Sequence, residues 1–423
     1  MRTAAKRNGL QEGLTPSEGI QEFEMSKTYE EINEKIKKRK AVVVTAEEMI
    51  DIVDDVGVKA AAKQVDVVTT GTFGPMCSSG AFINFGHSKP RIRATRVFMN
   101  QVEAYAGIAA VDCYIGATQT RHEAKDAHGN RDISYGGGHV IQDLVSGKSV
   151  RLVAESDGSD CYPNTYSEKD VTLDDLLNAF LFCPRNGYQN YPCAVNVSDK
   201  SISTYMGVLK PGLGNATYSS ARQLSPLLND PRFLTIGLGT RIFLGGGIGY
   251  VTGPGTQHNP DVPRTDAGIP MGPAGTMAVT GDLKTMTGRW LKGIHYRGYG
   301  ATMRVGIGVP IPVLNEEICK HTAVRDEEIK TAIIDFSYDY PYSTGKVLGE
   351  INYAQLRSGK IEIDGKTVPC FSQSNYSDAV CIARILKSWI QRGAFLLGQP
   401  VELLPHEKTA ASPPVQFDDT PNE

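Results

Sequence analysis

The sequence contains no long hydrophobic run. No stretch of about 18 apolar residues occurs in the 423-residue chain, so a transmembrane helix is excluded. Residues 1–24 contain no apolar signal core, and their acidic residues argue against an organelle transit peptide. We therefore expect a cytoplasmic protein with no membrane partner.

An excess of positive charge is also missing. The 44 Lys and Arg residues are matched by 47 Asp and Glu residues, which gives a formal net charge of -3. A nucleic-acid-binding protein is expected to have a basic stripe, so we expect no nucleic-acid partner. Hydrophobic residues make up 40% of a chain that is long enough to bury a sizeable core.

Several common active-site signatures are absent. The glycine clusters at 237–239 and 245–249 do not complete a G-x-G-x-x-G motif, because Ile242, Tyr250 and Thr252 stand where the third glycine belongs. No Walker A sequence and no G-x-S-x-G nucleophile elbow occurs. These absences argue against nucleotide-dependent enzymes and serine hydrolases.

Metal-binding and disulfide patterns are lacking as well. The eight cysteines include no C-x-x-C pair, and no cysteine–histidine spacing matches a zinc site. Because disulfides are rare in long cytosolic chains, we expect free thiols. Because no metal-ligand spacing occurs, we also expect no resident metal. The cysteines are Cys77, Cys113, Cys161, Cys183, Cys193, Cys319, Cys370 and Cys381.

Helix and strand signals alternate along the chain. Thr28 with Glu31, and Thr45 with Glu48, have the spacing of capping boxes that begin helices, and the second helix is expected to run to about residue 63. Other helices are predicted at 139–145, 172–183 and 377–392, strands at 65–69 and 150–155, and a hairpin turn at 364–365.

This alternation predicts an α/β fold with a mixed sheet, interleaved helices and glycine-rich loops that form the active site. We expect a flexible N-terminal extension over residues 1–26 and a single catalytic domain over 27–403. The composition of residues 404–423 predicts a disordered tail.

Cys77 has the most distinctive surroundings of the eight cysteines. A buried strand at 65–69 leads into the segment GTFGPMCSSG, which is rich in glycine and stiffened by Pro75. If Pro75 begins a helix, Cys77 lies in its first turn, where the helix dipole and free N–H groups favour the thiolate. Glycine turns of this kind can also form anion-binding nests.

Cys161 repeats this arrangement. The strand at 150–155 leads into SDGSDCYP, another polar glycine turn followed by proline. Ligands bind beyond the carboxyl ends of strands in α/β sheets, so Cys77 and Cys161 could meet in one pocket. The apolar contexts of Cys113, Cys183 and Cys381 predict core positions instead.

Long and unusual segments around these cysteines resemble a known family. The segment VDVVTTGTFGPMCSSGAFINFGHSKP from Val65 is similar to the homocysteine-biosynthesis family, and so are VEAYAGIAAVDCYIGATQ, YGGGHVIQDLVSG and the Cys161-Tyr162-Pro163 turn. The glycine-rich FLGGGIGYVTGPGTQH from Phe243 also resembles that family.

The resemblance implies a sulfurtransferase that inserts sulfur into L-aspartate 4-semialdehyde and forms L-homocysteine. It places the two functional cysteines at Cys77 and Cys161. It also implies sulfide or a sulfane-sulfur donor as a partner, and an external ferredoxin-type iron–sulfur protein that supplies electrons or sulfur. No cofactor bound in the chain is implied, and a homo-oligomer is left open.

These roles suggest a persulfide relay, with Cys77 preferred as the persulfide carrier and Cys161 as the resolving thiol, although the roles could be reversed. Two alternatives stay open: a non-catalytic sulfur or iron–sulfur carrier, and a thiol enzyme acting on a different small aldehyde. The expected substrate-binding residues are Gly71, Thr72, Gly74, Ser78, Ser79, His139, Arg185 and Arg241, with Arg297 as a further candidate for the substrate carboxylate.

Overall fold

A computed structural model describes residues 26–121, 125, 129–186, 189–342 and 345–406. Most of the expected N-terminal extension and C-terminal tail lies outside these residues. Leu404, at the start of the expected tail, is buried and its N–H donates to the carbonyl oxygen of Ile236. In the described part of the chain no helix is long and apolar enough to cross a membrane.

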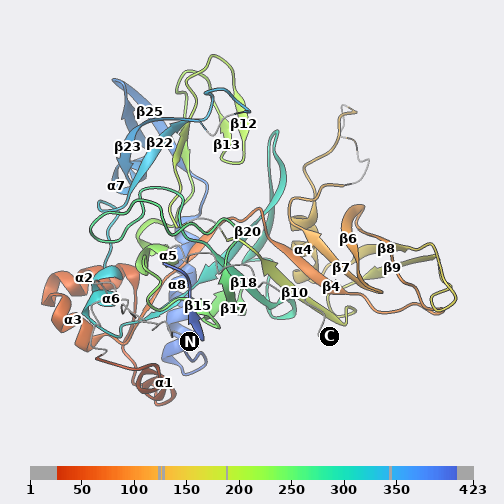
Figure 1. Cartoon of the computed structure of the whole chain (residues 1–423), viewed down its shortest axis with the longest axis horizontal. Coiled ribbons are helices and arrows are strands. Elements are labelled where there is room, and N and C mark those ends of the chain that lie inside the picture. Colours follow the sequence, from red (N-terminus) through yellow and green to blue (C-terminus); the bar gives the residue numbers. More distant parts are fainter. Residues whose placement is uncertain (1–25, 122–124, 126–128, 187–188, 343–344, 407–423) are drawn as a thin grey trace, which may run out of the picture.

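A large antiparallel sheet of 13 strands runs through the centre and one end of the molecule (Figure 1). Its order is β19-β20-β16-β17-β18-β10-β4-β7-β6-β5-β8-β9, and β3 pairs with β20. In that order the strands are β19 (Leu291–Tyr296), β20 (Gly300–Gly308), β16 (Arg241–Leu244), β17 (Gly247–Pro254), β18 (Met277–Asp282), β10 (Asn178–Cys183), β4 (Gly80–Asn84), β7 (Asp112–Gly116), β6 (Val102–Ala109), β5 (Arg96–Met99), β8 (Val150–Glu155), β9 (Tyr166–Val171) and β3 (Thr72–Pro75).

A six-stranded sheet of mixed direction forms the upper left region of Figure 1. It contains parallel pairs as well as antiparallel ones, and it has its own hydrophobic core. Its strands, in order, are β23 (Lys346–Asn352), β22 (Lys330–Asp335), β11 (Cys193–Val195), β14 (Ala216–Tyr218), β25 (Lys366–Ser372) and β24 (Lys360–Ile363).

Three smaller strand groups complete the sheet structure. One is the sheet β1 (Val43–Thr45), β2 (Val67–Thr69) and β21 (Pro310–Pro312), and the others are the pairs β12 (Ile202–Thr204) with β13 (Gly207–Leu209) and β15 (Gly237–Leu238) with β26 (Glu402–Leu403).

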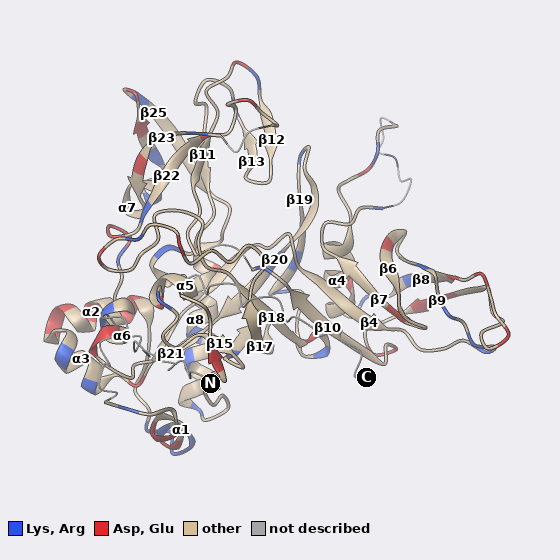
Figure 2. Ribbon diagram, viewed as in Figure 1, with Lys and Arg blue, Asp and Glu red and all other residues tan. Residues whose placement is uncertain are grey.

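Helices cover the sheets at several places. Acidic and basic residues are frequent along α1, α2 and α3, whereas the central strands contain few of them (Figure 2). The helices are α1 (Tyr29–Lys37), α2 (Ala46–Val56), α3 (Val58–Gln64), α4 (Gly137–Val145), α5 (Pro226–Asn229), α6 (Glu316–His321), α7 (Tyr353–Arg357) and α8 (Tyr376–Gln391), with 3-10 turns η1 (Arg222–Leu224) and η2 (Leu283–Thr285).

The expected mixed α/β architecture is confirmed, and so are both capping boxes. The side chains of Thr28 and Thr45 accept from the N–H groups three residues later, at the starts of α1 and α2. The predicted helix after Thr45 is interrupted at Gly57, whose φ of 78° ends α2 before α3 begins. The hairpin turn at Asp364 and Gly365 is also present, with positive φ at both residues.

The predicted helix at residues 172–183 is wrong. Asp175 does accept hydrogen bonds from the N–H and hydroxyl of Thr172, but this local contact closes only a turn. Residues 178–183 form β10, which pairs with β4 and β18 on its two sides. Backbone pairing across two neighbouring strands therefore overrides the helical spacing of the apolar residues.

Candidate functional site

Cys77 lies in a tight turn between two strands, β3 and β4. The N–H of Ser79 donates to the carbonyl oxygen of Met76 over 3.1 Å, which closes the turn around the thiol. The expectation that Pro75 begins a helix is wrong, because Pro75 is the last residue of β3 and pairs with Arg304. A helix dipole therefore does not act on Cys77, and the turn itself holds the half-buried thiol.

The thiol faces a cavity of about 350 Å³. Strand ends of the large sheet supply one wall, and residues near the six-stranded sheet and the β12–β13 hairpin supply the other. Such a cavity is large enough for a small polar metabolite. The lining residues are Pro75, Met76, Cys77, Ser78, Arg185, Tyr191, Tyr205, Met206, Ser219, Gln257, Tyr299 and Gln373.

Tyr299 is the side chain most closely tied to the thiol. It lies at the turn between β19 and β20, and its hydroxyl is hydrogen-bonded to Cys77. Burial, followed by the charge of Cys77 and this hydrogen bond, raises the pKa of Tyr299 well above its usual value. Tyr299 therefore stays protonated at neutral pH and can donate its proton in a hydrogen bond to a thiolate.

Replacing Tyr299 with phenylalanine should slow alkylation of Cys77 by iodoacetamide at neutral pH by about three- to tenfold. This range corresponds to the loss of one hydrogen bond, worth roughly 1 kcal/mol, that stabilises the reactive sulfur anion. Tyr166→Phe is the matched control, because it removes an exposed hydroxyl bonded to Glu168 on β9. Equal alkylation rates in both variants and the wild type would show that the Tyr299 hydroxyl does not influence the thiol.

Arg185 is the predicted carboxylate-binding arginine that the fold brings to Cys77. Its backbone carbonyl accepts a hydrogen bond from the Ser78 hydroxyl, and its positive charge acts on Tyr299. Arg241 lies elsewhere: its guanidinium stacks over Phe395, and its Nη1 donates to a backbone carbonyl oxygen. Arg297 is exposed between β19 and β20 and does not line the cavity.

The predicted glycine segment is a strand and not an anion-binding nest. The N–H of Gly71 donates to the carbonyl oxygen of Leu224, so it cannot bind substrate. Thr72 and Gly74 pair with β20 and line a small neighbouring cavity of about 50 Å³. The glycine at position 71 allows α8 to pack closely, because a Cβ there would clash with the carbonyl oxygen of Ala379.

We expect Gly71→Ala to lower the free energy of unfolding by about 2–3 kcal/mol, since the added methyl group overpacks the contact with α8. Denaturant titration would measure this loss. Gly349→Ala is the control, because nothing lies within 4 Å of a Cβ at that position. If the two variants were equally stable, close packing against α8 would not be the reason why residue 71 is a glycine.

Ser79 and His139 have local structural partners. Ser79 is buried, and its hydroxyl accepts a hydrogen bond from the thiol of Cys183 over 3.0 Å. His139 lies in the first turn of α4, where its Nδ1 accepts from the N–H of Gly136 and its ring stacks on Tyr135. Neither residue is among those that line the Cys77 cavity.

Within a single chain, Cys161 and Cys77 lie far apart in space. It is exposed on the connection between β8 and β9, at the right-hand end of Figure 1. The ring of Tyr162 stacks on His87, beyond the carboxyl end of β4, whereas Cys77 precedes the amino end of β4. The structure therefore does not bring the two thiols into one pocket of a single chain.

The other cysteines lie mainly in the core. Burial of Cys113 and Cys183 is confirmed, although Cys183 belongs to a strand and not to the expected helix. The core position predicted for Cys381 is wrong, because its side chain is exposed on α8. Three further buried cysteines are Cys193, Cys319 and Cys370.

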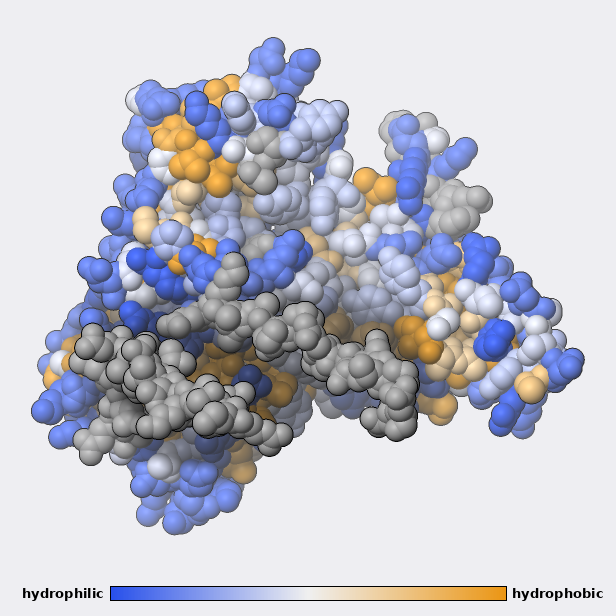
Figure 3. All heavy atoms as spheres, in the orientation of Figure 1, coloured by the Kyte–Doolittle hydropathy of each residue, from blue (hydrophilic) through white to orange (hydrophobic). Residues whose placement is uncertain are grey.

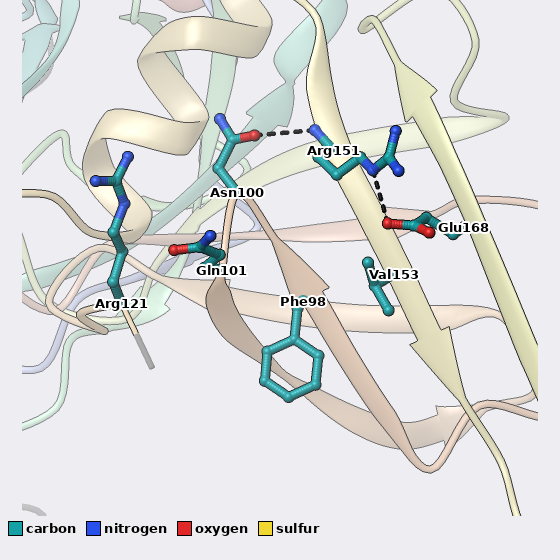
Figure 4. A pocket seen from close by; sticks show the side chains of 7 residues that line it. All are labelled: Phe98, Asn100, Gln101, Arg121, Arg151, Val153 and Glu168. Atoms are coloured by element: carbon teal, nitrogen blue, oxygen red, sulfur yellow. Dashed lines mark hydrogen bonds and ion pairs between the residues drawn. The ribbon is translucent and has the colours of Figure 1, made fainter. Parts of the chain in front are cut away.

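A larger cavity lies on another part of the sheet, near β5 and β8 (Figure 4). Its volume is about 680 Å³, and its described lining contains no thiol. Arg151 is neutralised there by Glu168, whose carboxylate accepts from Nε over 2.8 Å. The cavity thus lacks a nucleophile, and Cys77 marks the better candidate site. The residues that line this larger cavity are Phe98, Asn100, Gln101, Arg121, Arg151, Val153 and Glu168.

Comparisons with known proteins agree with the sequence resemblance. A model of the family described as "Homocysteine biosynthesis enzyme, sulfur-incorporation" matches residues 41–397. An L-aspartate semialdehyde sulfurtransferase of Methanosarcina acetivorans is 49% identical, covering 92% of this chain and 74% of that protein. One of Methanocaldococcus jannaschii is 52% identical, covering 89% of this chain and 73% of that protein.

A more distant relative, an uncharacterized protein of Methanothermobacter thermautotrophicus, is 28% identical over 85% of this chain and 78% of its own length. No solved structure matches. The family match spans the strands, turns and helices that surround Cys77. This chain therefore belongs to the family of homocysteine biosynthesis enzymes that incorporate sulfur.

Proposed function

We propose that this protein is a cytoplasmic L-aspartate semialdehyde sulfurtransferase, which forms L-homocysteine from L-aspartate 4-semialdehyde. The observation that carries the proposal is a half-buried thiol, Cys77, hydrogen-bonded to the Tyr299 hydroxyl in a small cavity that Arg185 also lines. The names of the two relatives that are about 50% identical supply the substrate.

The cavity offers a complementary group for each end of this substrate. The guanidinium of Arg185 suits the α-carboxylate, because arginine can bind a carboxylate through two parallel hydrogen bonds. The aldehyde carbon would then lie against the sulfur on Cys77. The Tyr299 hydroxyl can donate to the oxyanion that develops as the aldehyde is attacked.

The proposed chemistry begins with a persulfide on Cys77. Its terminal sulfur attacks the aldehyde carbon, forming a carbon–sulfur bond, and the carbonyl oxygen takes up a proton. The thiolate of Cys161 then attacks the Cys77 sulfur. This step forms a Cys77–Cys161 disulfide and breaks the sulfur–sulfur bond to the substrate, which leaves as a thiohemiacetal anion.

Two electron pairs are needed to complete the reaction. Loss of water from the thiohemiacetal gives a thioaldehyde, and two electrons with two protons reduce it to homocysteine. A second pair with two protons restores both cysteine thiols. We propose that a ferredoxin-type iron–sulfur protein supplies these electrons, because the family resemblance implies such a partner.

Turnover with L-aspartate 4-semialdehyde, a sulfane-sulfur donor and a low-potential reductant tests this function. We expect homocysteine to form only when all three are present. A panel of other small aldehydes serves as the control. Faster turnover of another aldehyde would replace the proposed substrate, and failure with every aldehyde would remove the enzymatic function.

The same protein preparation tests the alternative of an iron–sulfur carrier. A bound cluster normally uses about four thiolates, whereas Cys77 is the one thiol in the described lining of the cavity. We therefore expect anaerobically purified protein to show no visible sulfur-to-iron charge-transfer band. A stoichiometric band that disappears in Cys77→Ala would support the carrier instead.

A further inference from the structure

The described lining of the Cys77 cavity contains one cationic side chain, Arg185, and no carboxylate. L-Aspartate 4-semialdehyde carries an α-ammonium group as well as a carboxylate. The positive charge of this substrate therefore meets no opposite full charge in the described lining. Because a buried charged donor without a hydrogen-bond partner is costly, a neutral oxygen atom must accept from the ammonium group.

Most polar side chains in the lining already interact within the chain. The Ser78 hydroxyl donates to a backbone carbonyl oxygen, and the Ser219 hydroxyl lies 3.3 Å from the hydroxyl of Ser374. The Tyr299 hydroxyl is bonded to the thiol. An amide oxygen carries more negative charge than any of these hydroxyls, so a glutamine is the better acceptor for an ammonium group. Three other lining residues have interactions of their own: Tyr191, Tyr205 and Gln257.

Gln373 is held in place by three hydrogen bonds. Its backbone N–H donates to the carbonyl oxygen of Tyr218 over 2.7 Å, and its backbone carbonyl oxygen accepts from Nη2 of Arg304 over 3.2 Å. Its side-chain Nε2 donates to the carbonyl oxygen of Met206 over 2.9 Å. The backbone and the side chain of Gln373 are therefore both fixed beside the cavity that this residue lines.

The contact with Met206 also decides how the Gln373 amide is oriented. A backbone carbonyl oxygen only accepts hydrogen bonds, so the amide atom that faces Met206 must be the donor, Nε2. The amide oxygen, Oε1, then lies on the other branch and has no hydrogen-bond partner in the described part of the chain. Gln373 therefore offers an uncommitted, oriented acceptor to a ligand in the cavity.

The β12–β13 hairpin, which contains Met206, brings the two walls of the cavity together. It stands beside the β19–β20 hairpin (Figure 2), and the contact is so close that a Cβ at Gly298 would lie 2.5 Å from the Cβ of Ser203. In the space-filling view, the upper left lobe that contains this hairpin adjoins the rest of the molecule beside an open notch (Figure 3). The wall that contains Gln373 thus lies against the wall that contains Tyr299.

We infer that Gln373 determines the specificity for the amino group of the substrate. Its Oε1 accepts a hydrogen bond from the α-ammonium group of L-aspartate 4-semialdehyde, while Arg185 binds the carboxylate. This inference rests on the proposed function and extends it to the substrate class. The site selects α-amino acids with an aldehyde side chain, because an aldehyde acid without the amino group leaves Oε1 unpaired.

Succinate semialdehyde is the probe for this inference, since it has the same carboxylate and aldehyde but no amino group. We expect the wild type to favour L-aspartate 4-semialdehyde by about 10- to 100-fold in kcat/KM, the effect of one hydrogen bond to a charged group. Gln373→Met keeps the length of the side chain but removes Oε1, so it should lose this preference. The loss should appear in KM, because the ammonium charge does not change as the aldehyde is attacked.

A second variant separates the acceptor from the support of the hairpin. Gln373→Glu loses the donor to Met206, as Gln373→Met does, but it keeps an oxygen that can accept from the ammonium group. We expect it to retain the preference for the amino aldehyde. Thr217→Val is the matched control, because it removes the other hydrogen bond to the Met206 carbonyl oxygen, of 2.9 Å, from outside the described lining. It should also retain the preference.

Protection of Cys77 against iodoacetamide measures binding without turnover. L-Homoserine and 4-hydroxybutyrate are the probes, because they are the alcohols that correspond to the two aldehydes. In the wild type, L-homoserine should protect the thiol at about 10- to 100-fold lower concentration than 4-hydroxybutyrate. In Gln373→Met the two alcohols should protect at similar concentrations.

The outcomes distinguish this inference from the proposed function. Loss of the preference in Gln373→Met, with retention in Gln373→Glu, supports both. Equal kcat/KM for the two aldehydes in the wild type, or an unchanged preference in Gln373→Met, would overturn the role of Gln373 and leave sulfur transfer to aldehydes standing. If the wild type converted neither aldehyde, the proposed function would fail, and equal protection by the two alcohols would overturn the role of Gln373 as well.

Discussion

Cys77→Ala is expected to reduce kcat/KM for homocysteine formation by at least about a thousandfold. Loss of a catalytic nucleophile commonly has effects of this size or larger. Alanine leaves the β3–β4 turn intact, because the hydrogen bond that closes it joins the backbone groups of Met76 and Ser79. The variant should therefore fold normally and lose its sulfur-carrying atom.

The matched control is Cys381→Ala. Cys381 is an exposed thiol on α8 and is not among the residues that line the cavity. We expect this variant to keep wild-type turnover within about twofold, in line with ordinary surface substitutions. If Cys77→Ala retained more than a tenth of wild-type activity while remaining folded, Cys77 would not be the nucleophile.

Mass spectrometry can separate loading of sulfur from its transfer. Treatment with a sulfane-sulfur donor should add about 32 Da to the peptide that contains Cys77. The same adduct should accumulate in Cys161→Ala, because the proposed resolving thiol is missing. An adduct on the Cys161 peptide, with none on Cys77, would reverse the roles of the two cysteines.

Local interactions explain which parts of the fold could be predicted from the sequence. The capping boxes of α1 and α2 and the turn at Asp364 and Gly365 depend on contacts within a few residues. The segment that leads to Cys183 has helical spacing but forms a strand, because its structure depends on pairing with β4 and β18, which are distant in the sequence. Similarly, the exposure of Cys381 depends on how α8 is oriented against β3 and β20.

The candidate site shows the same division. The unusual segment around Cys77 points to the thiol, and the sequence offers Arg185 only as one of three candidate arginines for the substrate carboxylate. Tyr299 lies 222 residues after Cys77, in a hairpin with no recognisable motif, and only the pairing of β3 with β20 brings it near the thiol. Gln257 and Gln373 likewise reach the cavity through tertiary structure.

A buried ionic cluster is centred on Asp326. This carboxylate is fully buried and accepts from Nη1 of Arg222 over 3.0 Å and from the N–H of Gln223 over 3.1 Å. Arg222 also stacks over the ring of Tyr376 at the start of α8. Arg357 of α7 adds a second ion pair at 3.4 Å. One carboxylate therefore links η1 with α7 and, through Arg222, with α8.

Asp326→Ala should lower the free energy of unfolding by about 3–5 kcal/mol, because it leaves the Arg222 guanidinium buried without its counter-charge. Burial of an unpaired charge costs far more than loss of an exposed pair. Asp54→Ala provides that comparison: Asp54 pairs with Arg325 at the surface, and its removal should cost no more than about 1 kcal/mol. Denaturant titrations of both variants measure the difference. Similar midpoints for the two variants would mean that the buried cluster adds no more stability than a surface ion pair.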